Sequence, residues 1–135
     1  MLAVEDALDA LNWAKSIGGL PALIARSEAS LDVVKVWEET TPFFSFLAKK
    51  PATISNTSIT LSITDPQFVG LNDTKKAAIV SQVIKCLESE GVALDAASYR
   101  DAPPGIRIWA GPTVETSDVA ALLPWLDWAY AEVAQ

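Results

Sequence analysis

A strictly alternating stretch between residues 57 and 63 constrains this chain more than any other feature. It reads Thr-Ser-Ile-Thr-Leu-Ser-Ile, so every second side chain is large and apolar. Successive side chains of a β-strand point to opposite faces, so this pattern predicts a strand that buries one face and leaves the other polar. The flanking segments show apolar residues at helical spacing instead, and we expect helices to cover the buried face of the sheet.

The remaining elements follow from the same two periods. Helices are expected at about 2–17, 21–39, 73–90 and 116–134, and further strands at about 43–47, 93–99 and 106–109. On the last helix, three apolar side chains are expected in the core, namely Leu122, Trp125 and Trp128. The order ααββαββα predicts one two-layer α/β (α+β) domain over residues 1–135. Its sheet is expected to be small and mostly antiparallel, with three or four strands and helices on one face only. The other face is expected to carry outward Ser58, Thr60, Arg107 and Trp109.

Composition excludes several classes of function. The formal charge of -7 leaves no basic face for phosphate backbones, so we expect no nucleic-acid partner. The chain has no histidine, which removes Ser-His and Cys-His nucleophiles and leaves a poor ligand set for zinc. No apolar run approaches the ~20 residues of a membrane span, and we expect no membrane partner. The single cysteine, Cys86, has no partner for an internal disulfide, which suits a cytoplasmic location.

Two of the three arginines of this acidic chain flank a Pro-Pro-Gly turn. They are Arg100 and Arg107, within the stretch YRDAPPGIRIWAG. A guanidinium group binds a carboxylate or a phosphate with two parallel hydrogen bonds, so the pair suggests a site for an anion. Structural salt bridges explain the same spacing equally well. From the residues alone, both interpretations stay open.

Four segments, in this order, resemble the carboxy-terminal domain of the phosphoserine aminotransferase family: VEDALDALNWAKSIGGL, SNTS, SYRDAPPGIRIWAG and WLDWAYAE. The resemblance spans nearly the whole chain. It implies class V aminotransferases of pyridoxal phosphate (PLP) fold type I, which are cytoplasmic homodimers. Such enzymes exchange an amino group between glutamate and 3-phosphohydroxypyruvate in serine biosynthesis. Many bacterial members also act on a four-carbon phosphate ester in vitamin B6 biosynthesis.

The resemblance also implies roles for both arginines. Gly105-Ile106-Arg107 matches the family segment whose arginine holds the substrate α-carboxylate, and the alternative is a sheet-face arginine paired with a structural carboxylate. Arg100 lies where the family carries a His-Arg pair that receives the substrate phosphate. Here the pair is Tyr99-Arg100 and the linker to Arg107 is one residue longer, which weakens that second assignment.

The chain is expected to supply half of a site. In this family the lysine that binds PLP and the acidic partner of the pyridine nitrogen lie in a large domain that precedes this segment. None of the seven lysines here lies in a convincing setting for that role, so we expect no catalytic residue and no bound cofactor or metal in this chain. Met1-Leu2-Ala3 enters the first helix without a capping residue, which suggests that the chain was cut from a longer one.

Our hypothesis is therefore the small domain of a PLP-dependent phosphoserine transaminase, inactive alone. It would contact phosphoserine- and glutamate-type substrates and the missing large domain. The alternative is a stand-alone α/β module that binds a small anionic metabolite and regulates a partner.

Overall fold

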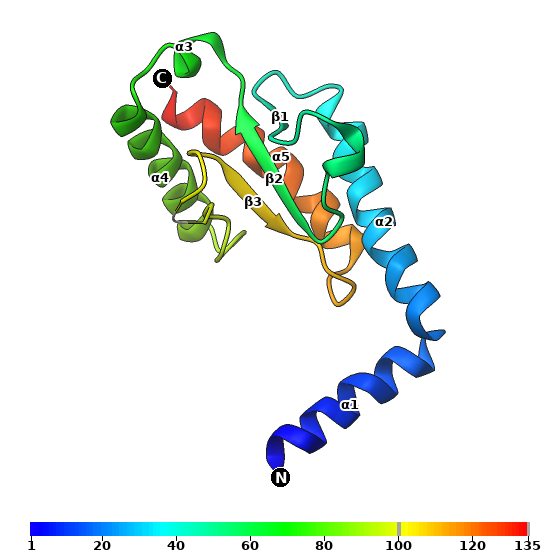
Figure 1. Cartoon of the computed structure of the whole chain (residues 1–135). Coiled ribbons are helices and arrows are strands. Elements are labelled where there is room, and N and C mark those ends of the chain that lie inside the picture. The colour runs from blue at the N-terminus through cyan, green and yellow to red at the C-terminus, as the bar shows by residue number, and fades with distance from the viewer. Residues whose placement is uncertain (100, 135) are drawn as a thin grey trace.

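Three strands form one antiparallel sheet in the computed structural model, which describes residues 1–99 and 101–134 (Figure 1). The strands are β1 (Phe44–Phe46), β2 (Ser58–Ile63) and β3 (Ile106–Trp109), in the order β1-β2-β3. The helices are α1 (Leu2–Ser16), α2 (Gly19–Glu38), α3 (Pro66–Val69), α4 (Asp73–Ser89) and α5 (Thr116–Val133), with a 3₁₀ turn at Pro51–Thr53. The predicted α+β class with a small antiparallel sheet is confirmed.

The alternating stretch forms the central strand, and its apolar side chains face the helices. In β2, Ile59, Leu61 and Ile63 are buried, and the intervening polar residues are half-buried. Ile59 pairs with Ile108 of β3, so both side chains lie on the core face. The next pair, Thr60 with Arg107, lies on the opposite face, because side chains alternate along each strand. The register therefore separates an apolar face from a polar one.

Three helices cover the apolar face of the sheet. Figure 1 shows α2, α4 and α5 together on one side of β2 and β3. Their buried apolar residues are Leu31 and Val34 on α2, Val80, Val83 and Leu87 on α4, and Val119, Leu123, Leu126, Ala129 and Tyr130 on α5. The expected core positions on the last helix were wrong by one register, because Leu122 and Trp125 are only partly buried and Trp128 is exposed.

Polar side chains fix how α2 and α5 meet. The indole Nε1 of Trp37, on α2, donates to Oδ2 of Asp127 over 2.8 Å. The hydroxyl of Thr41 donates to the other carboxylate oxygen of Asp127. One carboxylate on α5 thus accepts from both the end of α2 and the turn that follows it. This arrangement gives hydrogen-bond partners to polar groups that helix packing would otherwise bury without one.

Tyr130 ties α5 to the turn after β2. Its hydroxyl donates to Oδ2 of Asp65 over 2.9 Å, and the other oxygen of Asp65 accepts from the backbone N–H of Gln67 at the start of α3. The ring contacts Phe43, Phe44 and Phe68. Burial raises the pKa of the Tyr130 hydroxyl well above its ordinary value, and the hydrogen bond to Asp65 and the charge of that carboxylate act in the same direction.

The strand expected at 93–99 does not form. The segment runs as coil, with a single isolated antiparallel bridge between Ala97 and Ile106, to which the bond from Arg107 N–H to the carbonyl of Ala96 belongs. One bridge does not make a ladder, so the segment does not add a fourth strand to the sheet.

Glycine permits the close approach of the β3 turn to β2. A Cβ atom at Gly105 would lie 2.4 Å from the carbonyl oxygen of Leu61, which is closer than real Cβ contacts come. Gly18 and Gly19 have a different role, with φ angles of 118° and 70° that interrupt the helical path between α1 and α2. The predicted break there is confirmed, although α2 begins at Gly19 rather than near Pro21.

Helix α1 projects away from the rest of the chain (Figure 1). None of its residues is buried, and it contacts α2. Its exposed apolar side chains are Leu2, Val4, Leu8, Leu11 and Trp13. Among the described residues, no helix combines the length and apolar character needed to cross a bilayer.

Replacing Tyr130 with phenylalanine should lower the free energy of unfolding by about 1–2 kcal/mol, because the hydrogen bond to a charged acceptor is lost. The folded-state pKa of Tyr130 is raised, so its contribution is complete below pH 10 and declines as the pH rises above 10. Urea denaturation at pH 7 and at pH above 10 measures both effects. Tyr99→Phe is the matched control and should change stability little, since Tyr99 is exposed. A Tyr130→Phe variant as stable as the parent would contradict this account.

Replacing Gly105 with alanine should cost about 1–3 kcal/mol of stability, because the new methyl group forces β3 away from the Leu61 carbonyl. Gly70→Ala provides the control: its φ is -71° and the nearest atom to a new Cβ lies 3.6 Å away. Denaturant midpoints compare the two variants. Equal midpoints for both would show that the approach of β3 to β2 is not tight.

Candidate functional site

Arg107 lies on the polar face of the sheet, yet its side chain is only 10% exposed. It is at the second position of β3, directly after the turn that Gly105 allows. The coil segment 95–99 crosses this face and covers the guanidinium group. Arg107 thus lies on the expected face of the sheet. Its side chain is buried, however, and not exposed to solvent as expected.

Alternate residues of segment 95–99 contact the Arg107 side chain. Nη2 of Arg107 donates to Oδ2 of Asp95 over 2.6 Å, and Nε donates to the carbonyl of Ala97 over 3.2 Å. The ring of Tyr99 lies over the guanidinium carbon, 5.0 Å from its centroid. Asp95 and Tyr99 make their contacts through side chains and Ala97 makes its contact through the backbone carbonyl. The guanidinium plane is therefore fixed by a carbonyl, an ion pair and an aromatic face.

The ion pair with Asp95 is strongly asymmetric. The Arg107 side chain is 10% exposed and that of Asp95 is 77% exposed. An arginine keeps its charge at all relevant pH values, so a guanidinium group this buried requires an anion near it. Sequence reasoning allowed for a carboxylate partner but did not identify Asp95. The extended period of residues 95, 97 and 99 was the signal that could have found it.

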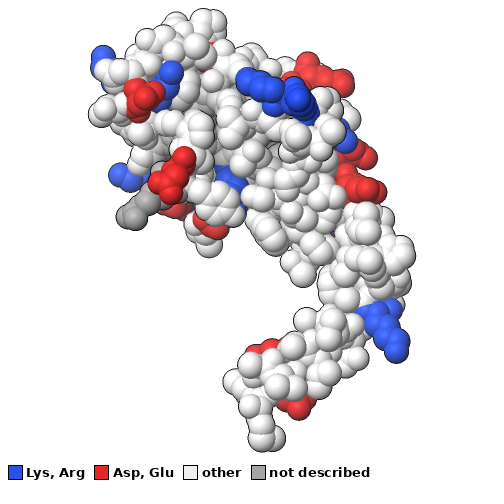
Figure 2. Space-filling view, viewed as in Figure 1, with Lys and Arg blue, Asp and Glu red and all other residues white. Residues whose placement is uncertain are grey.

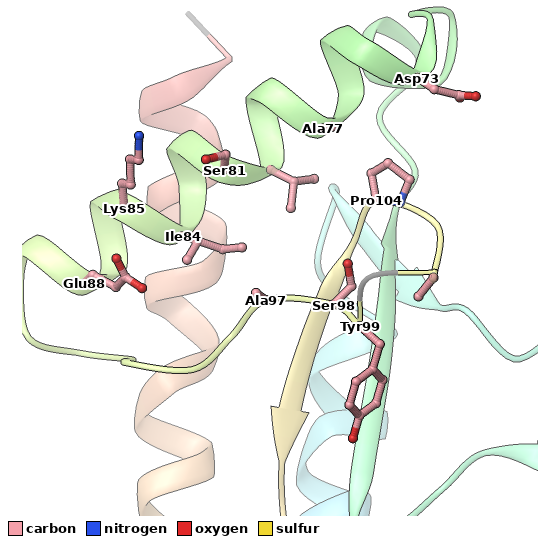
Figure 3. A pocket seen from close by; sticks show the side chains of 12 residues that line it. Asp73, Ala77, Ser81, Ile84, Lys85, Glu88, Ala97, Ser98, Tyr99 and Pro104 are labelled. Atoms are coloured by element: carbon pink, nitrogen blue, oxygen red, sulfur yellow. The ribbon is translucent and has the colours of Figure 1, made fainter.

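A groove is lined by Tyr99, the residue whose ring contacts this arginine. It has a volume of about 620 Å³ and lies between α4 and residues 97–99, 102 and 104 (Figure 3). Ser81, Ile84 and Lys85 line it from α4, and Tyr99 lies on the opposite side with its ring directed away from the helix (Figure 3). Tyr99 therefore contacts both the groove and the guanidinium group, although Arg107 itself does not line the groove.

Arg100, the outward-facing Trp109 and the SNTS segment, which begins at Ser55, give a mixed result. Arg100 lies outside the described residues, so its phosphate role stays a prediction. Trp109 is 51% exposed on the same sheet face as Arg107, as expected. Ser55 is used locally: its hydroxyl accepts from the backbone N–H groups of Thr57 and Ser58, which is the geometry of a turn before a strand.

The third arginine has a structural role. Nε of Arg26, on α2, donates to the carbonyl of Pro112 over 2.6 Å, and Nη2 pairs with Glu115 over 2.5 Å. The Arg26 guanidinium carbon also lies 5.8 Å from the ring centroid of Trp13 on α1. Arg26 therefore joins α1, α2 and the entrance to α5. Both of its polar contacts are internal, so it is not a candidate ligand group.

The described residues do not by themselves fit a PLP site. Six of the lysines are exposed and Lys76 is half-buried, so none is enclosed in a pocket that would shield a covalently held cofactor. Lys35 is ion-paired with Asp32. Within residues 1–99 and 101–134, no three His, Cys, Asp or Glu side chains gather as a metal-binding group would require. What these residues offer is one buried cation, in contact with a tyrosine that lines a groove.

Charged side chains are scattered over the whole surface. Figure 2 shows acidic and basic side chains over the main body and acidic side chains also on the projecting arm. Between the charged residues of this arm, α1 exposes the apolar side chains named above. The arm is thus a surface suited to contact with other apolar groups.

No family model matches the chain. Comparison with curated proteins finds two phosphoserine aminotransferases of methanogenic archaea, from Methanosarcina barkeri at 43% identity and Methanosarcina mazei at 42% identity, each over 130 residues. Both alignments cover 96% of this chain and 32% of the relative. A phosphoserine aminotransferase from Nocardioides sp. is 28% identical over 124 residues. The resemblance seen in the sequence motifs is confirmed: the chain is related to the phosphoserine aminotransferases, and it spans about a third of their length.

Proposed function

We propose that this chain is the carboxy-terminal domain of a phosphoserine aminotransferase, in which Arg107 binds the α-carboxylate of the substrate. The similarity over 96% of the chain supports the enzyme class. The observation that carries the role of Arg107 is its burial, at 10% exposure, with its only ionic partner among the described residues on an exposed side chain. A buried guanidinium whose only ionic partner is an exposed aspartate among the described residues is suited to an exchangeable carboxylate ligand.

The geometry supports a positioning role for Arg107. Its Nε donates to the carbonyl of Ala97, and the ring of Tyr99 covers one face, so the guanidinium plane is held before any ligand arrives. A substrate carboxylate bound to the remaining N–H groups would be fixed in direction as well as in place. Such orientation lowers the entropic part of the barrier, and a misplacement of about 1 Å can cost on the order of a hundredfold in rate.

The reacting groups belong to the rest of the proposed enzyme. When bound there, PLP would supply the electron sink that transamination requires. The residues described here do not fit that cofactor, so this chain would contribute only the carboxylate contact and, through Arg100, a phosphate contact. We therefore infer that the chain has no transaminase activity alone.

The exposed apolar face of α1 suits the partner that this proposal requires. Its residues Val4, Leu8 and Leu11 share helical spacing and are all exposed. The chain covers 32% of its archaeal relatives, which supports a larger domain elsewhere in the protein. That domain would cover the apolar side chains of α1, and the complete enzyme would be a cytoplasmic homodimer acting on phosphoserine and glutamate.

In the full-length protein, Arg107→Ala should reduce kcat/KM for phosphoserine by about 30- to 800-fold, the equivalent of about 2–4 kcal/mol for a charge-assisted pair. Steady-state transamination kinetics measure this loss. Arg26→Ala is the matched control, because it removes an arginine whose polar contacts are internal. Its KM for phosphoserine should be unchanged. An unaltered kcat/KM in Arg107→Ala would overturn the assignment.

Calorimetry of the 135-residue chain tests the alternative of a stand-alone module. Phosphoserine, serine and glutamate should each give no saturable heat, because one buried arginine does not make a complete site. Sedimentation velocity should at the same time detect self-association through the apolar face of α1. Saturable binding at micromolar concentration by a monomer would favour the regulatory module and contradict the domain proposal.

A further inference from the structure

We propose that the Asp95 carboxylate competes with the substrate carboxylate for Arg107, and that this competition lowers the apparent affinity of the enzyme for its substrate. This inference rests on the proposed function, because it assumes that Arg107 receives the substrate carboxylate. It concerns a residue that no motif singled out. Three features of the Arg107 environment support it.

The first feature is that Asp95 already holds a carboxylate where a substrate carboxylate would go. Nη2 of Arg107 donates to Asp95 over 2.6 Å, and Nε is held by the Ala97 carbonyl. A carboxylate that grips the guanidinium group with two parallel bonds uses two neighbouring N–H donors. With Nε occupied by a backbone group, any such pair includes Nη2. An incoming carboxylate must therefore displace Asp95 from that nitrogen or share it.

The second feature is the difference in burial across the pair. The Asp95 side chain is 77% exposed, so its carboxylate regains water as soon as it leaves Arg107. The Arg107 side chain is 10% exposed and would be left as a buried charge without an anion. Release is thus cheap for the aspartate and costly for the arginine unless another anion takes its place. This difference in burial is typical of a pair in which Asp95 can be replaced by another carboxylate on Arg107, and not of a permanent structural ion pair.

The third feature is that the exchange needs no change of fold. Asp95 lies in coil between α4 and β3, and the backbone contacts that anchor the segment involve Ala96 and Ala97 instead. Rotation of the Asp95 side chain alone breaks the ion pair. The bond from Arg107 to Ala97 and the contact with Tyr99 remain, so the guanidinium group stays oriented for the incoming carboxylate.

A substrate can bind only to the fraction of molecules in which Asp95 has left Arg107. The apparent dissociation constant is therefore the intrinsic dissociation constant divided by that fraction. An ion pair with one exposed partner is worth little, so the closed state should reduce the apparent affinity by about three- to tenfold. Ligands without a carboxylate would not displace Asp95. Asp95 thereby favours substrates that carry a carboxylate, because only a carboxylate replaces it on Arg107.

The test is the kinetics of Asp95→Ala and Asp95→Asn in the full-length enzyme. Both variants should lower the KM for phosphoserine and for glutamate by about three- to tenfold and leave kcat unchanged, because only the competitor is removed. Asp101→Asn is the matched control: it makes the same change in charge on the same stretch of chain, and its KM should be unchanged. Asparagine preserves the size of the side chain and guards against a folding defect in the alanine variant.

A raised or unchanged KM in both variants, with Asp101→Asn unchanged, would overturn the inference and make Asp95 a structural partner. The Arg107→Ala background separates this failure from failure of the proposed function. If Asp95 acts through Arg107, Asp95→Ala should have no effect on KM in that background. A full-length protein that does not transaminate phosphoserine, or that tolerates Arg107→Ala, would refute the proposed function itself.

Discussion

The register between β2 and β3 determines both the core of this chain and its candidate site. Ile59 pairs with Ile108 on the apolar face, and Thr60 pairs with Arg107 on the other. A slip of one residue would turn Ile108 outward and Arg107 into the core, and so would exchange the two faces at once. Gly105 allows this register, because a side chain there would collide with the Leu61 carbonyl. The apolar face of β2 makes the alternative registers costly.

Burial of Arg107 arises from a segment with little regular structure. Residues 95–99 are joined to the sheet by one isolated bridge, yet they supply an ion pair, a carbonyl acceptor and an aromatic ring to the same side chain. Such a segment can hold a charged group in a chosen orientation while leaving its anionic partner exposed. A fourth paired strand would bind the segment more firmly to β3. The coil is thus consistent with a cation that exchanges its partner.

Sequence patterns predicted the fold well in segments where apolar residues keep one spacing, helical or alternating, over the whole length of an element. The alternation at 57–63 and the helical spacing on both sides led to the correct sheet face, and the Gly18-Gly19 doublet led to the break between α1 and α2. The prediction of a strand at 93–99 was wrong. Local sequence does not show whether the backbone of a segment pairs with a neighbouring strand. On α5 the fully buried residues include Leu123, Leu126 and Tyr130, whereas the expected Leu122 and Trp125 are partly buried against the core and Trp128 is exposed.

The candidate site was predictable only in part. Arg107 stood out because it is a rare cation in an acidic chain and follows a Pro-Pro-Gly turn. Asp95 is twelve residues away and is one of seventeen acidic residues, so its proximity depends on how the coil crosses β3. Contacts of this kind arise from tertiary structure and leave little trace in local sequence. The exposed face of α1 likewise became evident only when the structure showed that no described residue covers it.

The central claim is that Arg107 recognises the carboxylate of the substrate. A substrate analogue without that group tests it most directly. In the full-length enzyme, the ratio of kcat/KM for phosphoserine to that for O-phosphoethanolamine should be large, and in Arg107→Ala it should fall by about 30-fold or more. The same ratio in both proteins would contradict the claim, because the arginine would then contribute nothing that depends on the carboxylate.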